Sequence, residues 1–413
     1  MTDETADTER LTTREAAERL GVKPETVYAY VSRGQLTSRR GASGRGSTFD
    51  AREIDALVRK GRREPPGGGD TLQRIRTGIT LIEQDRYYFR GVDAVELARR
   101  HSYEEIADWL WTGTLRAGIR FTAPPEALAA ARRAVGALPP ASGSADRLKV
   151  AAIAAAALDP LRYDLDRETV LGSARILVPT LVDALPTVGR ARPGDGPLAP
   201  RLWSRLTPAE ADDATLRALD LALSLLIDHD LAASTLAVRV AASARAHPYA
   251  VVSAGLGVLE GPLHGAASGL AHRMLAEVLE RGSAAAVVAD HLRAGRGVPG
   301  LGHRLYAGPD PRAEALFDAL SAIPAARAAL TAARAVEAAT ARHLELRANV
   351  DLALAVLSVS SGMKAEAGET VFAVARTAGW IAHALEEYEE RPMRMRPTGQ
   401  YGGPRPPQPL PRP

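Results

Sequence analysis

The feature that most constrains the fold is a series of alanine- and leucine-rich stretches of helical length that runs through most of the chain. Such stretches cover residues 211–246, 267–281 and 369–387. Runs of alternating β-branched residues, which would indicate half-buried strands, are nearly absent. With 413 residues, the chain is long enough for two or three domains and a well-buried core. We therefore predict a mainly α protein rather than a doubly wound sheet.

Composition narrows the class of protein further. Cysteine is absent, which excludes disulfides and thiolate metal ligands. No apolar run approaches the length of a membrane-spanning helix, and the acidic first nine residues do not resemble a signal peptide. We therefore expect a soluble, cytoplasmic protein. Only four of the 52 basic residues are lysines, and this bias makes a single arginine a weak indicator of phosphate binding.

Shifts in composition divide the chain. Residues 62–69 hold two arginines, two prolines and three glycines, a composition typical of a flexible linker. We assign residues 1–62 to a small N-terminal module and 63–70 to the linker. Other segments rich in proline and glycine are expected to form surface loops at 139–143 and 193–200 and a disordered tail at 402–413.

The N-terminal module has the element order of a winged helix-turn-helix. Thr12 or Thr13 is a suitable N-cap for its first helix, and Pro24 suits the first turn of its second helix. The predicted elements are a first helix at 13–20, a second helix at 24–32, a wing hairpin at 35–49 and a third helix at 51–58. The two leading helices share an apolar face that consists of Ala17, Leu20, Val27 and Val31.

Residues 11–59, above all TTREAAERLGVKPETVYAYVSRGQL, resemble the MerR/excisionase-type winged helix-turn-helix. In that family the second helix enters the major groove of DNA and the wing flanks it. The matching positions are Thr26, Tyr28 and Arg33 on the helix and Arg39, Arg40 and Arg45 in the wing. Residues 23–63 carry ten basic and four acidic side chains, which suits phosphate contacts. A cap for protein contacts, or a remnant of a fusion, stays open as an alternative.

Four residues of the main body stand out by their surroundings. His264 and His303 each lie in a glycine-containing loop, where a histidine is exposed or catalytic more often than it belongs to a core. Asp351 has mostly apolar neighbours, which would raise the pKa of its carboxyl group, although it would also suit a helix start paired with Arg347. Arg376 interrupts an apolar helical stretch with no carboxylate within a turn, so a ligand carboxylate would serve it. No pair of histidines has the helical spacing of a zinc site with an acidic partner, so no metal is predicted.

An ordered series of motifs then covers the chain from Gly78 to about Gly402. It consists of GITLIEQDRYYFRGVDAVELARRHSYEEIADWLWTG, IDHDLAASTLAVR, GPLHGAASG, GVPGLGHRLYAGPDPRA, NVDLALA, VFAVARTAGWIAHALEEY and RMRPTGQYGG. In this order and at these spacings the motifs resemble the citrate synthase family. The resemblance implies a mainly helical homodimer. Its large domain, residues 71–264 with 363–401, and its smaller mobile domain, 265–362, would close over the substrate.

The resemblance also implies an activity, the condensation of acetyl-CoA or propionyl-CoA with oxaloacetate to citrate or 2-methylcitrate. Asp351 matches the base that removes the α-proton of the acyl-CoA, His264 the residue that stabilises the resulting enol or enolate, and His303 the acid that protonates the ketone oxygen. The positions that match substrate-binding residues are His229, Arg312, Arg376 and, from the partner subunit, Arg396. Acyl-CoA would be a co-substrate, and no cofactor is expected.

The chain departs from the family pattern at Ala266, Ala307, Leu352 and Thr398. These changes affect the expected binding of the CoA phosphates and the shape of the pocket around the acyl methyl group. The identity of the acyl-CoA is therefore left open. Two other roles also stay open. One is a DNA-binding regulator that senses oxaloacetate or acyl-CoA through a synthase-like body, and the other is an enzyme whose helix-turn-helix serves only assembly. Retention of the acid–base trio favours an enzyme.

Overall fold

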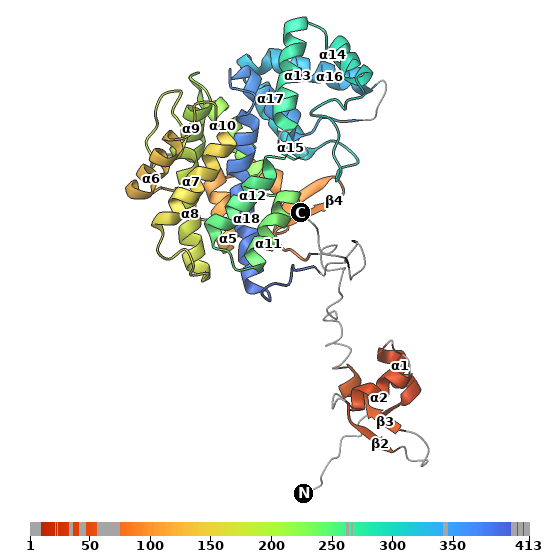
Figure 1. Ribbon diagram of the computed structural model, residues 1–413. Coiled ribbons are helices and arrows are strands. Elements are labelled where there is room, and N and C mark those ends of the chain that lie inside the picture. Colours follow the sequence, from red (N-terminus) through yellow and green to blue (C-terminus); the bar gives the residue numbers. More distant parts are fainter. Residues whose placement is uncertain are drawn as a thin grey trace. The chain divides into compact units, whose positions relative to one another are not determined.

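Figure 1 shows the computed structural model of the chain, coloured along the sequence. It describes residues 10–20, 22, 24–32, 36–40, 47–55, 75–261, 264–265, 267–341, 346–397, 403 and 408. The chain forms two compact units, one of residues 1–75 with 397–413 and one of residues 76–396. Helices dominate the second unit, so the predicted mainly α class is confirmed.

The first unit is a helix-turn-helix domain with a three-stranded antiparallel sheet of order β1-β3-β2. Its elements are β1 (Arg10–Thr12), α1 (Thr13–Leu20), α2 (Pro24–Ser32), β2 (Ser38–Arg40), β3 (Ser47–Asp50) and a helical segment at residues 51–55. Both α1 and α2 begin and end at the residues that the sequence predicts. Thr12 caps α1, since its hydroxyl accepts the backbone N–H of Glu15 at 3.3 Å. The sequence did not predict β1, because three residues are too few to establish a period.

A single small core holds this first unit together. Its buried members are Leu11, Ala16, Ala17, Val27, Leu36, Phe49, Ala51 and Ile54. Leu20 and Val31 pack against the edge of this core. The apolar face predicted for the two helices is therefore the face that they bury.

The second unit starts with an antiparallel sheet of order β4-β5-β6, formed by β4 (Thr80–Glu83), β5 (Arg86–Phe89) and β6 (Val92–Asp93). Its first helices are α4 (Ala94–Arg100), α5 (Tyr103–Thr112), α6 (Pro125–Gly136), α7 (Ser144–Leu158), α8 (Arg167–Ala184), α9 (Leu198–Leu206), α10 (Asp213–Leu225), α11 (Ala233–Ser243) and α12 (Pro248–Leu259). The later helices are α13 (Ala267–Arg281), α14 (Ala284–Arg293), α15 (Pro311–Ser321), the 3₁₀ turn η1 (Pro324–Ala326), α16 (Arg327–Ala341), α17 (Val350–Ser360) and α18 (Ala367–Glu389).

Two groups of helices are visible within this second unit in Figure 1. In one group α13 packs against α17 and α14 against α16. In the other group α7, α8, α10, α11 and α12 all contact α18. The first group falls within residues 265–362, which the sequence assigns to a small domain. The boundary itself stays a prediction, because the division of the chain into compact units does not separate the two groups.

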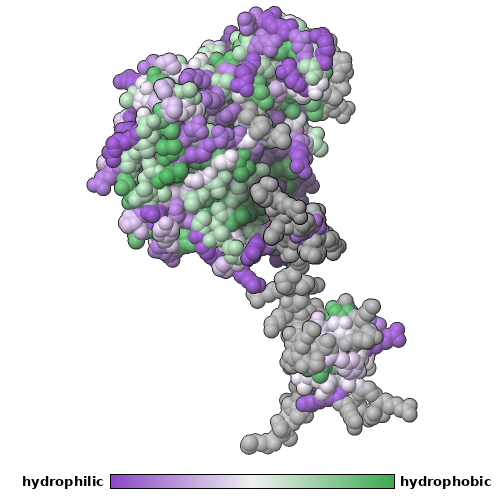
Figure 2. Space-filling view, viewed as in Figure 1, coloured by the Kyte–Doolittle hydropathy of each residue, from purple (hydrophilic) through white to green (hydrophobic). Residues whose placement is uncertain are grey.

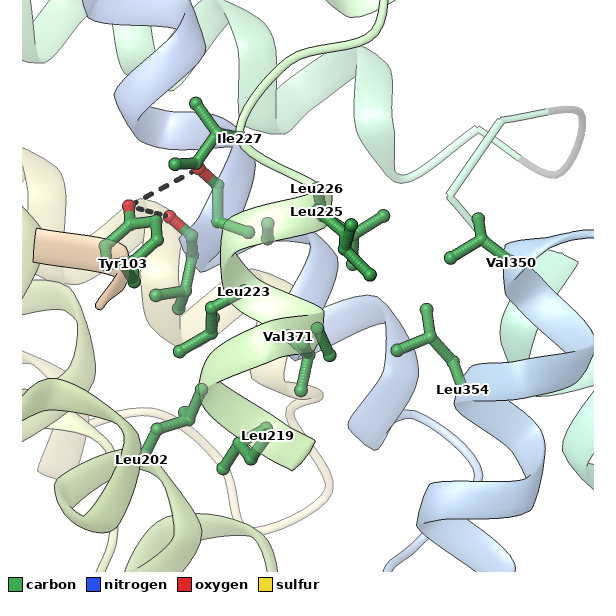
Figure 3. Packing of buried hydrophobic residues seen from close by; sticks show 14 of the residues in the cluster. Tyr103, Leu202, Leu219, Leu223, Leu225, Leu226, Ile227, Val350, Leu354 and Val371 are labelled. Carbon is green, nitrogen blue, oxygen red and sulfur yellow. Dashed lines mark hydrogen bonds between the residues drawn. The ribbon is translucent and has the colours of Figure 1, made fainter. Parts of the chain in front are cut away.

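Helix α18 is the central element of the larger group. Nearly all of its residues are buried from Ala367 to Leu385. The hydroxyl of Tyr103 donates to the carbonyl oxygens of Val374 at 3.0 Å and Ala375 at 3.3 Å. Figure 3 shows Tyr103 among buried apolar side chains. A polar group of α5 thus adds to the apolar packing that holds α18.

The stretch 211–246, which the composition assigns to one helical run, is two helices. Helix α10 ends at Leu225 and α11 begins at Ala233. Asp230 between them has a left-handed φ of 58°, a conformation that aspartate tolerates better than most residues. The break exists because the polar residues Asp228 and His229 are buried there and need partners that a continuous helix surface would not provide.

Two short helices, α12 and α17, are almost entirely apolar. In the described part of the chain, no single helix is both long and apolar enough to cross a membrane. The helical segments Pro311–Ser321 and Pro324–Ala341 reach that length and apolar content only when they are taken together, and the pair is bent by 117°.

Candidate active site

His229 lies in the segment between α10 and α11, residues 226–232. This segment lies against Gly379 of α18, where a Cβ would be only 2.1 Å from the carbonyl oxygen of Ile227, so glycine is required. The side chain of His229 is buried, and its Nε2 shares a 2.6 Å hydrogen bond with the hydroxyl of Tyr306. Burial, followed by neighbouring positive charges, lowers the pKa of His229 well below its usual value, so this ring is neutral at pH 7.

The loop that carries His303 is held against the start of α17. Gly300 has a φ of 79°, and a Cβ there would lie 2.7 Å from the Cβ of Leu352, so the loop approaches the helix more closely than another residue would allow. The side-chain amide of Asn349 donates to the carbonyl oxygen of Gly302 at 2.8 Å. These contacts join two segments that the sequence singled out separately.

The protonation of His303 follows from its surroundings. Its Nδ1 accepts the backbone N–H of Leu305 at 3.0 Å, so in the neutral ring the proton is on Nε2 and this atom is a donor. Burial, followed by the charge of Arg312, lowers the pKa of His303 to about 4. Its ring centroid lies 5.0 Å from that of His229 and 4.8 Å from that of Tyr306. His303 is therefore a neutral donor beside a second neutral histidine.

Arg312 is buried at the first turn of α15 and is paired with Asp310. Nε and Nη2 of Arg312 donate to the two carboxylate oxygens of Asp310 at 3.0 and 2.8 Å. Asp310 also accepts the backbone N–H of Val350, the first residue of α17, at 3.1 Å. The remaining nitrogen, Nη1, makes no hydrogen bond within the described residues and is free for a ligand.

Asp351 follows in the first turn of α17, and its backbone N–H donates to the N-cap side chain of Asn349 at 3.0 Å. Burial raises the pKa of Asp351 to about 6, although the charge of Arg312 acts in the opposite direction. The carboxyl group is thus more basic than usual, as its apolar neighbours suggested, and it is still largely ionised at pH 7. Within the described residues it forms no ion pair with Arg347.

Arg376 is buried in α18 and uses only part of its hydrogen-bonding capacity. Its Nε donates to the carbonyl oxygen of Leu226 at 2.9 Å, and within the described residues its two terminal nitrogens make no hydrogen bond. Its guanidinium lies 4.4 Å from the ring centroid of Phe372. Burial lowers the pKa of Arg376 to about 10, while the charge of Asp228 favours the protonated form. The carboxylate of Asp228, which belongs to a distant segment, therefore lies close enough to stabilise the charge of Arg376. The local sequence around Arg376 did not reveal this partner.

His264 joins the site through Phe372. Its ring lies 6.1 Å from the ring of Phe372, on which Arg376 also packs. Its Nε2 shares a 2.8 Å hydrogen bond with Oγ of Ser234 in the first turn of α11. Burial, followed by the charge of Arg376, lowers the pKa of His264, so this ring is also neutral at pH 7. The neighbouring positions Pro262, Leu263 and Ala266 lie outside the described residues.

Arg396 lies far from this cluster within its own subunit. Residues 393–395 pack at the end of α11, where Met395 N–H donates to Oγ of Ser243 at 3.3 Å. Ser243 is nine residues beyond Ser234, and at 1.5 Å per residue the two are about 13 Å apart along the helix axis. Arg396 is exposed. It therefore lies near the opposite end of α11 from His264, a position compatible with its assignment to a partner's site.

Comparisons with known proteins identify the family of the second unit. Residues 70–398 match the family described as "Citrate synthase, C-terminal domain". The chain belongs to the citrate synthase family. A citrate synthase of Haloferax volcanii is 32% identical over 350 residues, which span 79% of this chain and 92% of that relative. Residues 10–62 match a helix-turn-helix domain, as the sequence predicted.

Solved structures of citrate synthases share the fold. The enzyme from Pyrobaculum aerophilum has a TM-score of 0.68 at 27% identity and covers 82% of this chain and 92% of its own. The enzyme from Thermotoga maritima has a TM-score of 0.66 at 28% identity and covers 83% of this chain and 97% of its own. Membership of the citrate synthase family makes the chain an enzyme of the acyltransferase class.

The helix-turn-helix domain exposes part of the predicted DNA-binding set. Thr26 and Tyr28 are exposed on α2, and Arg39 is exposed on β2. The hydroxyls of Tyr28 and Thr13 lie 3.2 Å apart. Arg33, Arg45 and the side chain of Arg40 lie outside what the structure describes.

The sequence analysis did not identify three residues of the candidate site. Tyr306 contacts His229, Asp310 pairs with Arg312, and Asp228 accompanies Arg376. Asp310 has a local signal, because it lies two residues before an arginine at a helix start and can cap that helix. The other two pairings join distant segments and leave no local pattern. Among the described residues, no group of three His, Asp or Glu side chains is arranged to hold a metal ion.

Proposed function

We propose that the protein condenses acetyl-CoA with oxaloacetate to give citrate and CoA. Asp351 takes a proton from the α-carbon of the thioester while His264 donates a hydrogen bond to the thioester oxygen. The α-carbon then attacks the ketone carbon of oxaloacetate, and Nε2–H of His303 gives its proton to the ketone oxygen. Water hydrolyses the resulting citryl thioester and releases CoA. No step of this sequence requires a metal or a further cofactor.

Protonation states support these roles. A thioester α-proton is weakly acidic, so its removal needs both a base and a donor at the oxygen where charge develops. Asp351, with a pKa of about 6, is ionised yet more basic than an ordinary aspartate. The lowered pKa values of His264 and His303 keep both rings neutral, so each carries an N–H donor without introducing a buried positive charge.

The proposal of a dicarboxylate substrate rests on arginine nitrogens that have no hydrogen-bond partner within the described residues. Two buried guanidinium groups, those of Arg312 and Arg376, have terminal nitrogens that make no hydrogen bond within the described residues, and neutral His229 lies in the field of both. An arginine with both terminal nitrogens available, as in Arg376, can bind a carboxylate through two parallel hydrogen bonds, and Nη1 of Arg312 can donate to a second carboxylate. Oxaloacetate has a carboxylate at each end, so one molecule would satisfy both arginines.

We propose further that the active form is a homodimer. Hydrophobic side chains gather on the surface over α7, α8 and α12 in Figure 2. Around the end of α7, Ile153, Leu158, Leu161 and Tyr163 are 62, 49, 61 and 69% exposed. Apolar exposure of this kind is typical of an interface that another chain covers. In such a dimer, we assign Arg396 of the partner subunit to the oxaloacetate site, as the family resemblance implies.

Measurement of free thiol release from purified protein tests the proposed reaction, with oxaloacetate and either acetyl-CoA or propionyl-CoA. We expect turnover with acetyl-CoA. The two thioesters differ by one methylene, which a pocket discriminates by only about 1–3 kcal/mol. Faster turnover with propionyl-CoA would therefore reassign the product to 2-methylcitrate. No turnover with either thioester would reject the enzyme and favour a sensor of oxaloacetate or acyl-CoA.

A second function, DNA binding, is favoured by the exposed Thr26, Tyr28 and Arg39 on one helix and one wing strand. Gel shifts with genomic DNA fragments at several salt concentrations test it. The full chain should bind more weakly as salt rises, because phosphate contacts release counterions. A chain without residues 1–69 should not bind. Equal retardation by both chains would leave the domain with a role in assembly.

A further inference from the structure

The hairpin that joins β4 and β5 has a strained turn. Its strands pair in register up to Glu83 and Arg86, which leaves Gln84 and Asp85 as a two-residue loop. Both have left-handed backbones, with φ of 51° and 57°. Such turns favour glycine, asparagine and aspartate, so the strain lies at Gln84 and Asp85 suits its position. Strained backbone of this kind persists where other contacts fix it.

The side chain of Asp85 provides those contacts. Its Oδ1 accepts the backbone N–H of Ala307 at 2.8 Å, and its Oδ2 accepts that of Gly308 at 3.1 Å. At Gly308 a Cβ would lie 2.9 Å from Oδ2 of Asp85, so glycine permits this close approach. Two consecutive N–H groups on one carboxylate are charge-assisted hydrogen bonds, which are stronger than neutral ones. We call this arrangement the Asp85 clamp.

The clamped loop, residues 303–308, carries His303 and also Tyr306, whose hydroxyl is bonded to His229. Because His303 and Tyr306 lie only five and two residues before Gly308, the clamp fixes the end of the short segment that positions them. A cleft of about 330 Å³ lies between the hairpin and the start of α15, lined by Asp85, Arg86, Pro309 and Pro311 among others. The cleft begins just beyond the loop, at Pro309, and the two hydrogen bonds of Asp85 attach the end of the loop to the hairpin.

The same hairpin also contacts the other half of the site. The hydroxyl of Thr80 in β4 donates to Oδ2 of Asp228 at 2.5 Å, and that of Tyr87 in β5 donates to the carbonyl oxygen of Leu225 at 3.3 Å. The strands thus support the segment that carries His229, while the tip holds the loop that carries His303. One small hairpin connects both histidines.

We propose that Asp85 is a positioning residue for the reaction: by clamping residues 307–308 it sets the distance between His303 and His229 and so the fit of the ketone of oxaloacetate. The hairpin belongs to the predicted large domain and the loop to the predicted small domain. The clamp would therefore also link the two predicted domains. This inference rests on the proposed function for its kinetic consequences but not for its structural ones.

Two glycine variants separate the clamp from the turn. Asp85→Gly removes the carboxylate but suits the left-handed backbone, whereas Gln84→Gly relieves the strain at Gln84 and leaves the clamp intact. We expect Asp85→Gly to raise KM for oxaloacetate about tenfold, as for the loss of one hydrogen bond to a charged group. KM for acetyl-CoA should change little, whereas the melting temperature should fall because two hydrogen bonds to a carboxylate are lost. Gln84→Gly should match the wild type. Asp85→Asn, which suits the turn but keeps only one acceptor, should fall between the two.

Hydrogen exchange gives a readout that does not depend on activity. The amides of residues 307 and 308 should exchange faster in Asp85→Gly than in Gln84→Gly or the wild type. Equal exchange and equal KM for oxaloacetate in the two glycine variants would overturn the clamp. If the wild type shows no turnover, the proposed function fails, and the exchange rates together with calorimetry of oxaloacetate binding still decide the role of Asp85.

Discussion

The carboxylate of Asp310 holds the guanidinium of Arg312 through two hydrogen bonds, although the two residues are only two positions apart. The same carboxylate accepts the N–H of Val350 at the start of α17. One buried anion therefore orients both the proposed substrate-binding arginine and the helix that carries Asp351. Although its own burial acts in the opposite direction, the charge and hydrogen bonds of Arg312 keep the pKa of Asp310 below its usual value.

This arrangement predicts that Asp310→Asn weakens both the fold and the site. Removal of one partner of a buried ion pair leaves the other charge uncompensated, a loss of about 3 kcal/mol in the free energy of unfolding. We expect KM for oxaloacetate to rise at least tenfold, because Arg312 loses its orientation. Denaturant unfolding and steady-state kinetics measure the two effects. Asp318→Asn, on the same helix but with a side chain 70% exposed, is the control. A Asp310→Asn variant as stable and as active as this control would contradict the assignment.

Asp351→Asn separates binding from chemistry. We expect oxaloacetate to bind with unchanged affinity in calorimetry, because the variant keeps both arginines and the three histidines. Turnover should fall at least about a thousandfold, which is within the range for loss of a general base. Near-normal turnover would reject Asp351 as the base.

The same variant should not be less stable than the wild type at pH 7. The folded protein holds the proton of Asp351 up to a pKa of about 6, whereas an unfolded aspartate loses it near pH 3.9. The folded state therefore binds more protons in this range, and its stability falls as pH rises through it. Asparagine removes this cost. A melting temperature equal to or above that of the wild type would agree, and a lower one would show that the carboxylate stabilises the fold.

The pH dependence of kcat/KM for acetyl-CoA should report the same group. Protonation of Asp351 removes the base, so the rate should fall tenfold per pH unit below about pH 6 and be level above it. The pKa of His303 is about 4, so its titration lies below this range. In Asp310→Asn the midpoint should move to lower pH, because the negative charge of Asp310 contributes to the raised pKa of Asp351. A midpoint that stays unchanged in this variant would assign the titration to another group.

Sequence alone located much of this architecture and missed specific parts of it. The first and last residues of α1 and α2 were predicted correctly from the apolar face of each helix, a capping threonine and Pro24. These signals all indicate the same helix limits. The same reasoning merged α10 and α11, since apolar composition continues up to the buried Asp228 and His229. His264, His303 and Asp351 stood out only modestly by their surroundings, and it was the ordered series of family motifs that indicated them as the catalytic trio. Tyr306, Asp228 and Asp85 were not found, because each acts through a partner on a distant segment.

The proposed dimer leads to a complementation test. If each site combines Asp351 of one subunit with Arg396 of the other, Asp351→Asn and Arg396→Ala should each be inactive alone. In a mixed dimer, one site then has both native residues and the other has neither. Random exchange in an equal mixture makes half of the dimers mixed, so about a quarter of wild-type activity should return.

The surface over α7 gives the control for this test. Ile153→Glu places a charge on the exposed apolar face and should produce monomers in sedimentation experiments, without activity even when Arg396 is present. Neither variant subunit holds both Asp351 and Arg396. Activity can therefore return in the mixture only if subunits exchange and each site takes one of these residues from each chain. A mixture that exchanges subunits and stays inactive would mean that Arg396 serves the chain to which it belongs, whereas full activity of Arg396→Ala alone would mean that it serves no site.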